Sequence, residues 1–556
     1  MNPIVYQTRI DRAHPGMIFS PLRGTLLAAE VAMERWEPSR TYTKKEQFIL
    51  KRLVTKRRLF AFLRNHRHEI FDDAFQEELE TMYRKTGAGK EPKPPALMAM
   101  ALLLQGYTGL SDGDAVEATV IDLRWQLVLD TLGEDEPAFS QGTLQAFRER
   151  LIAHDLDRRL LERTVELARA TREFDWKKLP KTLRVAMDSS PLEGAGRVED
   201  TINLLAHAAR KVVECAAGLL DWPAERVCRE AGIPLLLESS VKKALDLDWS
   251  DPVQKGSAVK SLTVQLESLR DFIFLQLGEE MAKPPLQGEV ETLVQLMRQD
   301  LEPDPRGGGV RIREGVAPDR RVSVEDGEMR HGRKSKSKRF NGFKRHIATD
   351  LDTNLILAGA ITPANWPEEQ AAPELQKDIA LQGSEIGELS IDRGYISSPL
   401  VDEILGAGGE VICKPWGSRN GKAFSKAAFR INMRDRTITC PAGEVEHLRF
   451  GSVVEFDPEA CDPCSLRSQC TAATPGVGRT VAIALNEKLQ HKLRKLQASP
   501  RGRAKLRERV TVEHRLAHIS RRQGRRARYR GTRKNLFDLR RACAIQNLET
   551  IQRKAA

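Results

Sequence analysis

The segment LRVAMD, residues 183–188, predicts a short apolar strand that ends on a carboxylate, Asp188. Two serines, Pro191 and a Gly-Ala-Gly turn follow, and these residue types end a strand. The segment LSIDRGY, residues 389–395, repeats the design with Asp392. If both strands end at one edge of a sheet, the two carboxylates lie side by side, which is costly unless a cation lies between them. The pair is a candidate metal site, although an Asp that caps a turn explains each one alone.

Length and composition exclude several classes of protein. The chain has 556 residues, enough for about three or four domains. No apolar run approaches the roughly 18 residues of a membrane span. Met1 to Arg12 contains no apolar segment before a small-residue cleavage site, so we expect a cytoplasmic protein rather than an exported one. Eight cysteines in so long a chain argue against a disulfide framework.

The net charge of +12 is concentrated near the C-terminus. Arg501 to Arg541 carries sixteen Arg or Lys residues against Glu508, Glu513 and Asp538. Such a block predicts a polyanion-binding surface, with nucleic acid as the partner. A solvated basic tail is the alternative, but Leu, Val and Ile recur through the segment.

The first part of the chain is predicted to be helical. Residues 1–44 show weak periodicity and suggest a partly ordered arm, whereas residues 45–86 fit one or two amphipathic helices. Further helices are expected at 96–105, at 114–132 after the N-cap Ser111, and at 142–154 after the N-cap Ser140. Short capped helices are typical of helix-turn-helix modules, and a helical domain that merely packs is equally consistent.

After the Asp188 strand, residues 200–335 predict an all-α insertion with helices at 199–220, 224–231, 239–245 and 259–277. Strands are then expected at 343–349, 355–361, 388–392 and 410–414, with helices at 368–380 and 399–405. Without the insertion, the order is strand, hairpin, helix, strand, helix, strand. This order predicts an α/β fold with a mixed five-stranded, ribonuclease H-like sheet.

Four cysteines cluster where the sheet elements end: Cys440, Cys461, Cys464 and Cys470. Four thiols around a C-x-x-C core in a reducing compartment suit a tetrahedral structural zinc ion. A metal-free Cys-rich loop and redox chemistry are the alternatives. The remaining cysteines, Cys215, Cys228, Cys413 and Cys543, are isolated and are interpreted as core residues.

The chain resembles DDE transposases of bacterial insertion sequences, in the subgroup whose helical N-terminal domain precedes a ribonuclease H-like core. The resemblance covers nearly the whole chain and depends on the joint order of several motifs. They are GYTGLS at 106–111, the stretch from Asp188 to Gly196 that ends in PLEGAG, HGRK at 331–334 through GFKRH at 342–346, DRGY at 392–395, CPAG at 440–443 and RYRG at 528–531.

The resemblance implies metal-dependent cutting and joining of DNA ends, with Asp188 and Asp392 in the two Asp roles. In the wider group the catalytic Glu often has a Tyr seven residues before it, an Arg four before it and a Lys seven after it. Around Glu513 the three places hold Leu506, Arg509 and Ser520, so only the Arg matches. Two Mg²⁺ or Mn²⁺ ions need oxygen ligands from several carboxylates, which this triad would supply.

Helix periodicity favours Glu513 over Glu508 as the third carboxylate. Residues 503–519 lack Gly and Pro and predict one helix, on which Leu506, Val510, Glu513 and Ala517 form a single stripe expected to face the sheet. Glu508 lies about 140° around that helix, on a face where ordinary surface ion pairs explain it. The alternative for Glu513 is an ion pair with Arg509 one turn back.

Basic residues beside these elements are candidates for phosphate contacts. Two groups are predicted to bind DNA: Arg333, Lys334, Lys336, Lys338, Arg339 and Lys344 near the hairpin, and Arg525, Arg526, Arg528 and Arg530 near the C-terminus. The expected partners are double-stranded DNA, as terminal inverted repeats and target, and a second copy of the chain on DNA. A catalytically silent DNA-binding protein and a nuclease of the same fold are the rival functions.

The predicted organisation has four parts. Residues 1–175 form a helical DNA-binding and assembly domain. Residues 181–200, 338–430 and 500–556 form the catalytic domain. Residues 201–337 form the helical insertion, and residues 431–485 form the Cys-rich module.

Overall fold

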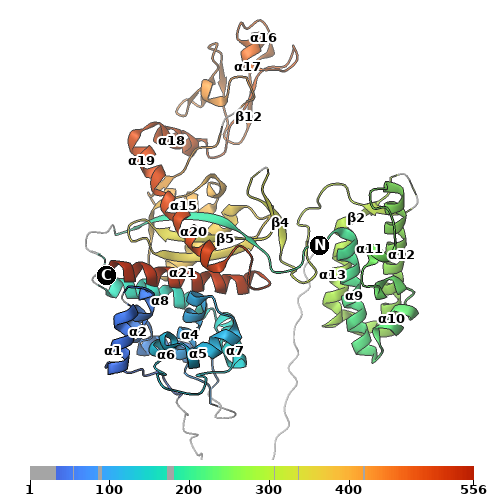
Figure 1. The fold of residues 1–556 in the computed structure, drawn as a ribbon. Helices are drawn as coiled ribbons and strands as arrows, with labels where there is room; N and C mark the ends of the chain where they lie inside the picture. Colours follow the sequence, from blue (N-terminus) through green and yellow to red (C-terminus); the bar gives the residue numbers. More distant parts are fainter. Residues whose placement is uncertain are drawn as a thin grey trace, which may run out of the picture.

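The computed structural model describes residues 33–53, 55–84, 91–171, 174, 181–305, 307, 309–335, 337–417 and 420–555. Most of the predicted N-terminal arm therefore lies outside the described residues. The main body is a mixed sheet flanked by helices, with two further lobes (Figure 1).

The N-terminal region is helical, as predicted. Its helices are α1 (Lys44–Leu53), α2 (Arg58–Ile70), α3 (Asp73–Glu80), α4 (Pro95–Thr108), α5 (Asp112–Ile121), α6 (Leu123–Leu129), α7 (Gln141–Ala153) and α8 (Leu156–Ala170). Both predicted N-caps are confirmed, because Ser111 accepts from the Asp114 amide and Ser140 from the Thr143 amide. The single helix expected at 114–132 is wrong: Asp122 leaves the helical conformation and caps α6 instead.

The central sheet has six strands: β1 (Leu183–Glu193), β4 (Arg330–Arg333), β5 (Arg339–Asp350), β6 (Ile356–Pro363), β7 (Ile386–Ser390) and β8 (Glu410–Ile412). The order is β4-β5-β1-β7-β8, with β6 pairing the same edge of β5 as β4 does. β5 is antiparallel to β1 and β6, whereas β1, β7 and β8 are parallel. The predicted order of strands, hairpin and helices is confirmed. The count of five strands is wrong, because β4 adds a sixth.

Strand β1 does not stop at Asp188 as the sequence suggested. It continues to Glu193, because β5 pairs with it as far as the register Glu193↔Gly342. The parallel partner β7 ends earlier, at Ala186↔Ser390, so the last part of β1 has β5 alone as a neighbouring strand. Pro191 is tolerated there because a proline fits where one side of a strand is unpaired.

The two faces of the sheet belong to different hydrophobic cores. On β1, Val185 and Met187 pack in one core with helices α14 (Ala372–Leu381) and α15 (Pro399–Gly406). Ala186 and Leu192 face the other core. This alternation has the two-residue period of a strand, and it places Asp188 on the same face as Ala186.

The second core also contains the N-terminal helices and the C-terminal helices α20 (Val510–Gln523) and α21 (Thr532–Lys554). Helix α21 lies between the sheet and the N-terminal helices (Figure 1) and is buried on nearly all sides, which explains why its sequence shows no apolar stripe. The N-terminal helices and the sheet therefore share one continuous core.

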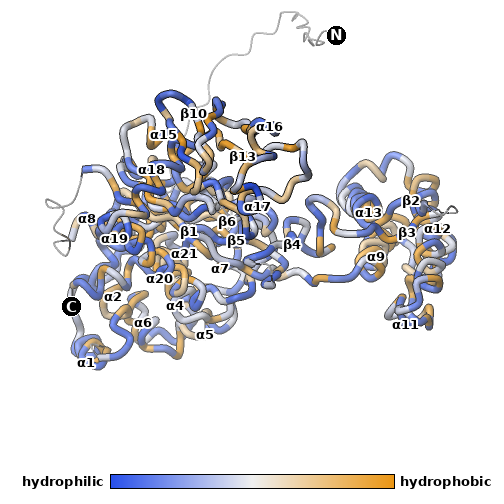
Figure 2. Tube along the Cα trace, turned by 90° about the horizontal axis from the view of Figure 1, so that it is seen from above, coloured by the Kyte–Doolittle hydropathy of each residue, from blue (hydrophilic) through white to orange (hydrophobic). Residues whose placement is uncertain are grey.

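The segment between β1 and β4 forms a lobe with its own core. Its elements are α9 (Thr201–Leu220), α10 (Ala224–Glu230), η2 (Pro234–Leu237), α11 (Val241–Ala244), α12 (Pro252–Leu277), η3 (Gly278–Ala282), α13 (Leu286–Asp300), β2 (Leu301–Pro303) and β3 (Val310–Ile312). The lobe stands apart from the sheet in two perpendicular views (Figures 1 and 2). The all-α prediction for 201–337 is wrong in two respects, because β2 and β3 form a hairpin and β4 belongs to the central sheet.

The Cys-rich segment forms a third lobe, built on short hairpins around Phe429, Ile438 and Phe456. It contains η6 (Lys426–Ala428), β9 (Arg430–Asn432), β10 (Thr437–Thr439), β11 (Val445–His447), β12 (Val453–Glu455), α16 (Pro458–Cys461), α17 (Arg467–Cys470) and β13 (Thr480–Ala482). Helices α18 (Glu487–Ala498) and α19 (Pro500–Glu508) lead back to the sheet. The single helix expected at 503–519 is wrong: the chain breaks at Arg509, between α19 and α20.

Candidate active site

The register of the parallel strands brings Asp188 and Asp392 to the same edge of the sheet. The pairing of β1 with β7 ends at Ala186↔Ser390, and each Asp lies two residues beyond its end of that pair. Asp392 caps the short helix η5 (Arg393–Tyr395), and its Oδ1 accepts a hydrogen bond of 2.6 Å from the Gly394 amide. This placement follows from the strand pattern of the sequence.

A cavity of about 450 Å³ opens at this edge, and the three predicted carboxylates all line it. It is lined by Asp188, Ser189, Ser190, Pro191, Arg333, Lys334, Phe340, Lys344, Glu368, Asp392, Glu513, Leu516, Ala517 and Ser520. Strand β1, the β4–β5 hairpin, the segment after β6, the end of β7 and helix α20 each contribute. The wall of this cavity therefore contains both carboxylates and basic side chains.

Arg509 joins two of the carboxylates. Its guanidinium lies 2.9 Å from Oδ2 of Asp188 and 2.7 Å from Oε1 of Glu513. The break between α19 and α20 occurs at this residue, where no Gly or Pro signals it in the sequence. The cation offsets charge repulsion between the acidic groups.

Glu513 reaches the cavity for a reason different from the predicted one. The buried residues of α20 are Val512, Leu516, Ile519 and Gln523, which form the stripe that packs on the sheet. Val510 is 43% exposed and the Glu513 side chain 49% exposed, so the predicted stripe through them is wrong. Glu513 lies at the edge of the real stripe, paired with Arg509 one turn back.

Glu508 points to a different part of the sheet. It pairs with Arg184 of β1, whose guanidinium also lies 3.0 Å from both Glu388 and Asp352. The expected surface pairs within its own helix are replaced by this contact between elements. Glu508 does not line the cavity that contains Asp188 and Glu513.

The structure adds Glu368, a carboxylate that the sequence reasoning missed. It begins the short helix η4 (Glu368–Ala371) after β6, and it accepts a hydrogen bond from the Ser189 hydroxyl. Burial, together with the charges of Asp392 and Asp188, raises the pKa of Glu368 above its usual range. Burial likewise raises the pKa of Asp188, even though Arg509 opposes the shift.

Two fully buried side chains, those of His346 and Tyr395, lie beneath the carboxylates of the site. His346 on β5 shares hydrogen bonds of 2.6 Å with the Tyr395 hydroxyl and 2.9 Å with the Thr362 hydroxyl. Burial lowers the pKa of His346 to about 3, so the imidazole is neutral. The pair ties the DRGY segment to the hairpin.

The basic residues of the hairpin lie beside the carboxylates. Arg333 and Lys334 line the cavity and are exposed, and Lys338 and Arg339 follow on the same hairpin. Lys336 lies outside the described residues. The Lys344 ammonium donates to the Trp366 carbonyl at 2.6 Å, and burial lowers its pKa.

The second predicted DNA-binding group, between α20 and α21, makes contacts within the protein. Arg526 donates to the carbonyls of Gly194 and Ala195, and Arg528 donates to those of Leu110 and Gly109. Arg530 pairs with Glu325 at 3.0 Å, and Arg525 is exposed. Three of the four arginines predicted to contact phosphates therefore form bonds within the protein instead.

Two family models match this chain. The family described as "Transposase DDE domain" matches residues 316–548, which include Asp392 and Glu513. Over this segment the chain is similar to a DDE transposase domain. The family "Transposase domain (DUF772)" matches residues 49–150, and no curated protein or solved structure matches significantly. The resemblance to DDE transposases is confirmed, and the transposase domain agrees with a ribonuclease H-like core.

The match begins at residue 316, beyond the inserted lobe. Asp188 therefore lies outside the matched segment, although β1 and β5 pair side by side in the sheet of the transposase domain. Within the described residues, no three His, Cys, Asp or Glu side chains are arranged to hold a metal ion. In the site around Asp188, Arg509 lies between two of the carboxylates.

The four clustered cysteines are all free and half-buried. They line a small hollow of about 30 Å³. Burial raises the pKa of the Cys470 thiol, and the other three thiols raise it further. The isolated Cys228, Cys413 and Cys543 are buried, as predicted, and Cys215 packs at the edge of the inserted lobe's core.

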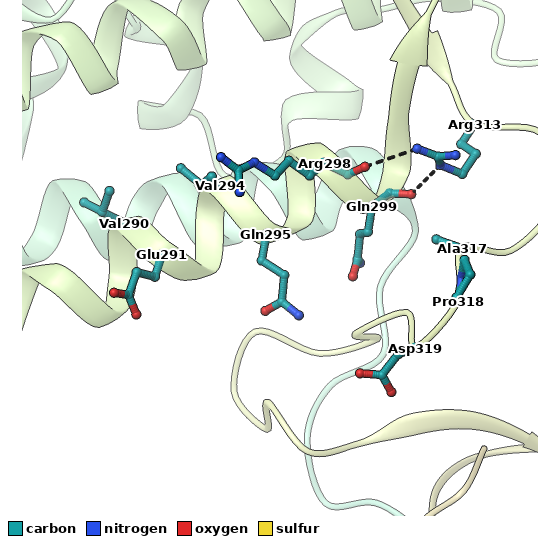
Figure 3. A pocket seen from close by; sticks show the side chains of 10 residues that line it. All are labelled: Val290, Glu291, Val294, Gln295, Arg298, Gln299, Arg313, Ala317, Pro318 and Asp319. Atoms are coloured by element: carbon teal, nitrogen blue, oxygen red, sulfur yellow. Dashed lines mark hydrogen bonds between the residues drawn. The ribbon is translucent and has the colours of Figure 1, made fainter. Parts of the chain in front are cut away.

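A larger hollow, of about 650 Å³, lies between α13 and the segment before β4 (Figure 3). Its polar groups bond within the protein: Arg313 donates to the carbonyls of Gln299 and Arg298, and Asp319 pairs with Arg330 at 2.7 Å. These contacts join the inserted lobe to the hairpin that lines the active-site cavity. No helix in the described part of the chain is long and apolar enough to cross a membrane.

Proposed function

We propose that this chain is a DNA transposase that cleaves transposon ends and joins them to target DNA by phosphodiester hydrolysis and transesterification. The observation that carries the proposal is the cavity at the sheet edge, which Asp188, Asp392 and Glu513 line together. Its basic rim suits a phosphodiester backbone. The expected partners are double-stranded DNA and a second copy of the chain on that DNA.

The donor set of the cavity fits Mg²⁺ or Mn²⁺, because it consists of carboxylate oxygens without thiols or exposed imidazoles. When bound, two such ions supply activation of a water or a DNA 3′-hydroxyl and stabilisation of the leaving oxygen. Asp188, Asp392 and Glu513 would hold these ions through their carboxylate oxygens.

The chain's own residues perform the rest of the work. Arg333 and Lys334 hold the phosphate backbone against the carboxylates. Arg509 neutralises Asp188 and Glu513, and its guanidinium would compete with a divalent cation for the Asp188 carboxylate. The neutral His346–Tyr395 pair keeps the segment that carries Asp392 in place.

The test is nicking of supercoiled plasmid in Mg²⁺ or Mn²⁺ by variants Asp188→Ala and Asp392→Ala. Both should abolish nicking while DNA binding, measured by gel shift, stays largely intact. Asp402→Asn, an exposed Asp on α15, is the matched control and should nick like the wild type. Wild-type cleavage by either Ala variant would refute the assignment.

The same assay separates the rival functions. A silent DNA-binding protein would bind DNA but never nick it. A nuclease of this fold would nick it without strand-transfer products when transposon ends and a target plasmid are supplied. Joined products that depend on Asp188 support the transposase alone.

We also propose that Cys440, Cys461, Cys464 and Cys470 hold one structural zinc ion. The support is a hollow of single-ion size lined by four thiols, two of them in a C-x-x-C turn. The core around Phe456 is small, and a metal would stabilise so small a lobe.

A further inference from the structure

Glu368 lies where three separate elements meet, because it begins η4 after β6 and lies close to β1 and to the segment after β7. Its Oε1 accepts from the hydroxyl of Ser189, the residue that follows Asp188. The residue also lines the same cavity as the predicted triad. Glu368 thus reaches across from the segment after β6 to the catalytic end of β1.

The packing around Gly394 fixes how close Glu368 comes to Asp392. A Cβ on Gly394 would lie 2.2 Å from Oε2 of Glu368 and 3.1 Å from Oδ1 of Asp392. Both carboxylate oxygens therefore lie within 3.1 Å of one point. A side chain at this position would therefore displace the Glu368 carboxylate from where it lies.

Lys344 lies close enough to attract Glu368 and Asp392, but within the described residues it forms no ion pair with either carboxylate. In the described part of the chain, no Lys or Arg forms an ion pair with Glu368, and Arg509 is engaged with Asp188 and Glu513. The nearby Lys344 directs its ammonium at the Trp366 carbonyl. A carboxylate beside two others costs free energy unless a cation joins them, and a hydrogen bond from Ser189 would be satisfied equally well by a neutral Gln.

We propose that Glu368 is a fourth carboxylate ligand of the divalent-metal site. The inference rests on the proposed function, because it assigns a further ligand to that metal site. Glu368 lines the same cavity as Asp188, Asp392 and Glu513, and its carboxylate lies beside that of Asp392. The proposed site then contains carboxylate oxygens from β1, from η4, from the segment after β7 and from α20.

The test is a Mn²⁺ titration of the purified full-length chain without DNA, with free Mn²⁺ measured by electron paramagnetic resonance. Glu368→Gln keeps the acceptor for Ser189 but removes the charged ligand, and it should raise the Kd for Mn²⁺ at least about tenfold. Glu369→Gln removes the same charge one residue later, outside the cavity, and should stay within about twofold of the wild type. Thermal unfolding checks that each variant is folded.

Asp188→Asn distinguishes failure of this inference from failure of the proposed function. If Asp188→Asn loses Mn²⁺ while Glu368→Gln binds like the wild type, Glu368 is not a ligand and the proposed site stands. If the wild type binds no Mn²⁺, or Asp188→Asn binds as the wild type does, the metal site itself is wrong and Glu368 falls with it. Equal weakening by Glu369→Gln would also overturn the assignment, because a distant charge would then explain the effect.

Discussion

The assignment of the third carboxylate can be tested by one matched pair of substitutions, Glu513→Gln and Glu508→Gln. The two residues flank the break at Arg509, and each side chain is about half exposed and forms one ion pair with an arginine. Each substitution should therefore cost at most about 1 kcal/mol of stability, the usual value of a partly exposed ion pair. Arg184 also keeps Glu388 and Asp352, each at 3.0 Å, when Glu508 is neutral.

The effects on catalysis should differ far more than the effects on stability. Glu513→Gln removes a metal ligand, and a loss of about 4 kcal/mol of transition-state stabilisation corresponds to about a thousandfold slower nicking. Glu508→Gln should nick within about threefold of the wild type, because that side chain lies outside the cavity.

The assay is the initial rate of Mg²⁺-dependent plasmid nicking, with thermal unfolding of both variants measured alongside it. Similar unfolding midpoints with unequal rates would support the assignment. A dead Glu508→Gln variant beside an active Glu513→Gln variant would refute it.

Four further perturbations test other parts of the molecule. Arg509→Gln should lower the unfolding midpoint measured without metal. Mn²⁺ should then raise the midpoint of this variant more than that of the wild type, because Arg509 and a cation compete for the same carboxylates. An equal Mn²⁺ effect on both proteins would contradict this competition. Because the pKa of Glu368 is raised, the folded protein holds a proton on this carboxyl more tightly than the unfolded protein does. The stability of the wild type therefore falls as the pH rises from about 4 towards the raised pKa. In metal-free thermal unfolding, Glu368→Gln should be more stable than the wild type at pH 7 but not below about pH 4. Elemental analysis should find about one zinc per chain, and Cys461→Ser should lose it; a zinc-free wild type purified without chelator would count against the site. Neutralising Arg333 and Lys334 should weaken binding to all DNA sequences and reduce the salt dependence, whereas an unchanged salt slope would show a merely solvated loop.

Much of the fold and two of the site residues could be predicted from local patterns in the sequence. In the sequence, Asp188 and Asp392 each come after a short apolar run, and the parallel register that unites them is a regular consequence of the strand order. The caps at Ser111 and Ser140 are equally local, because a side chain bonds an amide three residues away.

Features that depend on tertiary contacts escaped the sequence reasoning. The strand β4 is four residues long and is specified by its pairing with β5 rather than by its own composition. The break at Arg509 has no Gly or Pro, and its side chain bonds to Asp188 on a strand far away in sequence. Glu368 has no local mark either, since its place beside Asp392 depends on the room that Gly394 leaves.

The lobe between β1 and β4 has a consequence for how the sheet is assembled. Strands β1 and β5 pair over nine positions, yet roughly 150 residues separate them, and closing so long a flexible loop carries a large entropic cost. If the lobe folds first around its own core, the flexible connection shrinks to roughly 30 residues, which lowers that cost by about 1.4 kcal/mol. This difference corresponds to about a tenfold faster pairing of the two strands. A mutation that empties the lobe's core, such as Leu269→Ala, would then slow the formation of a catalytic edge that it never touches.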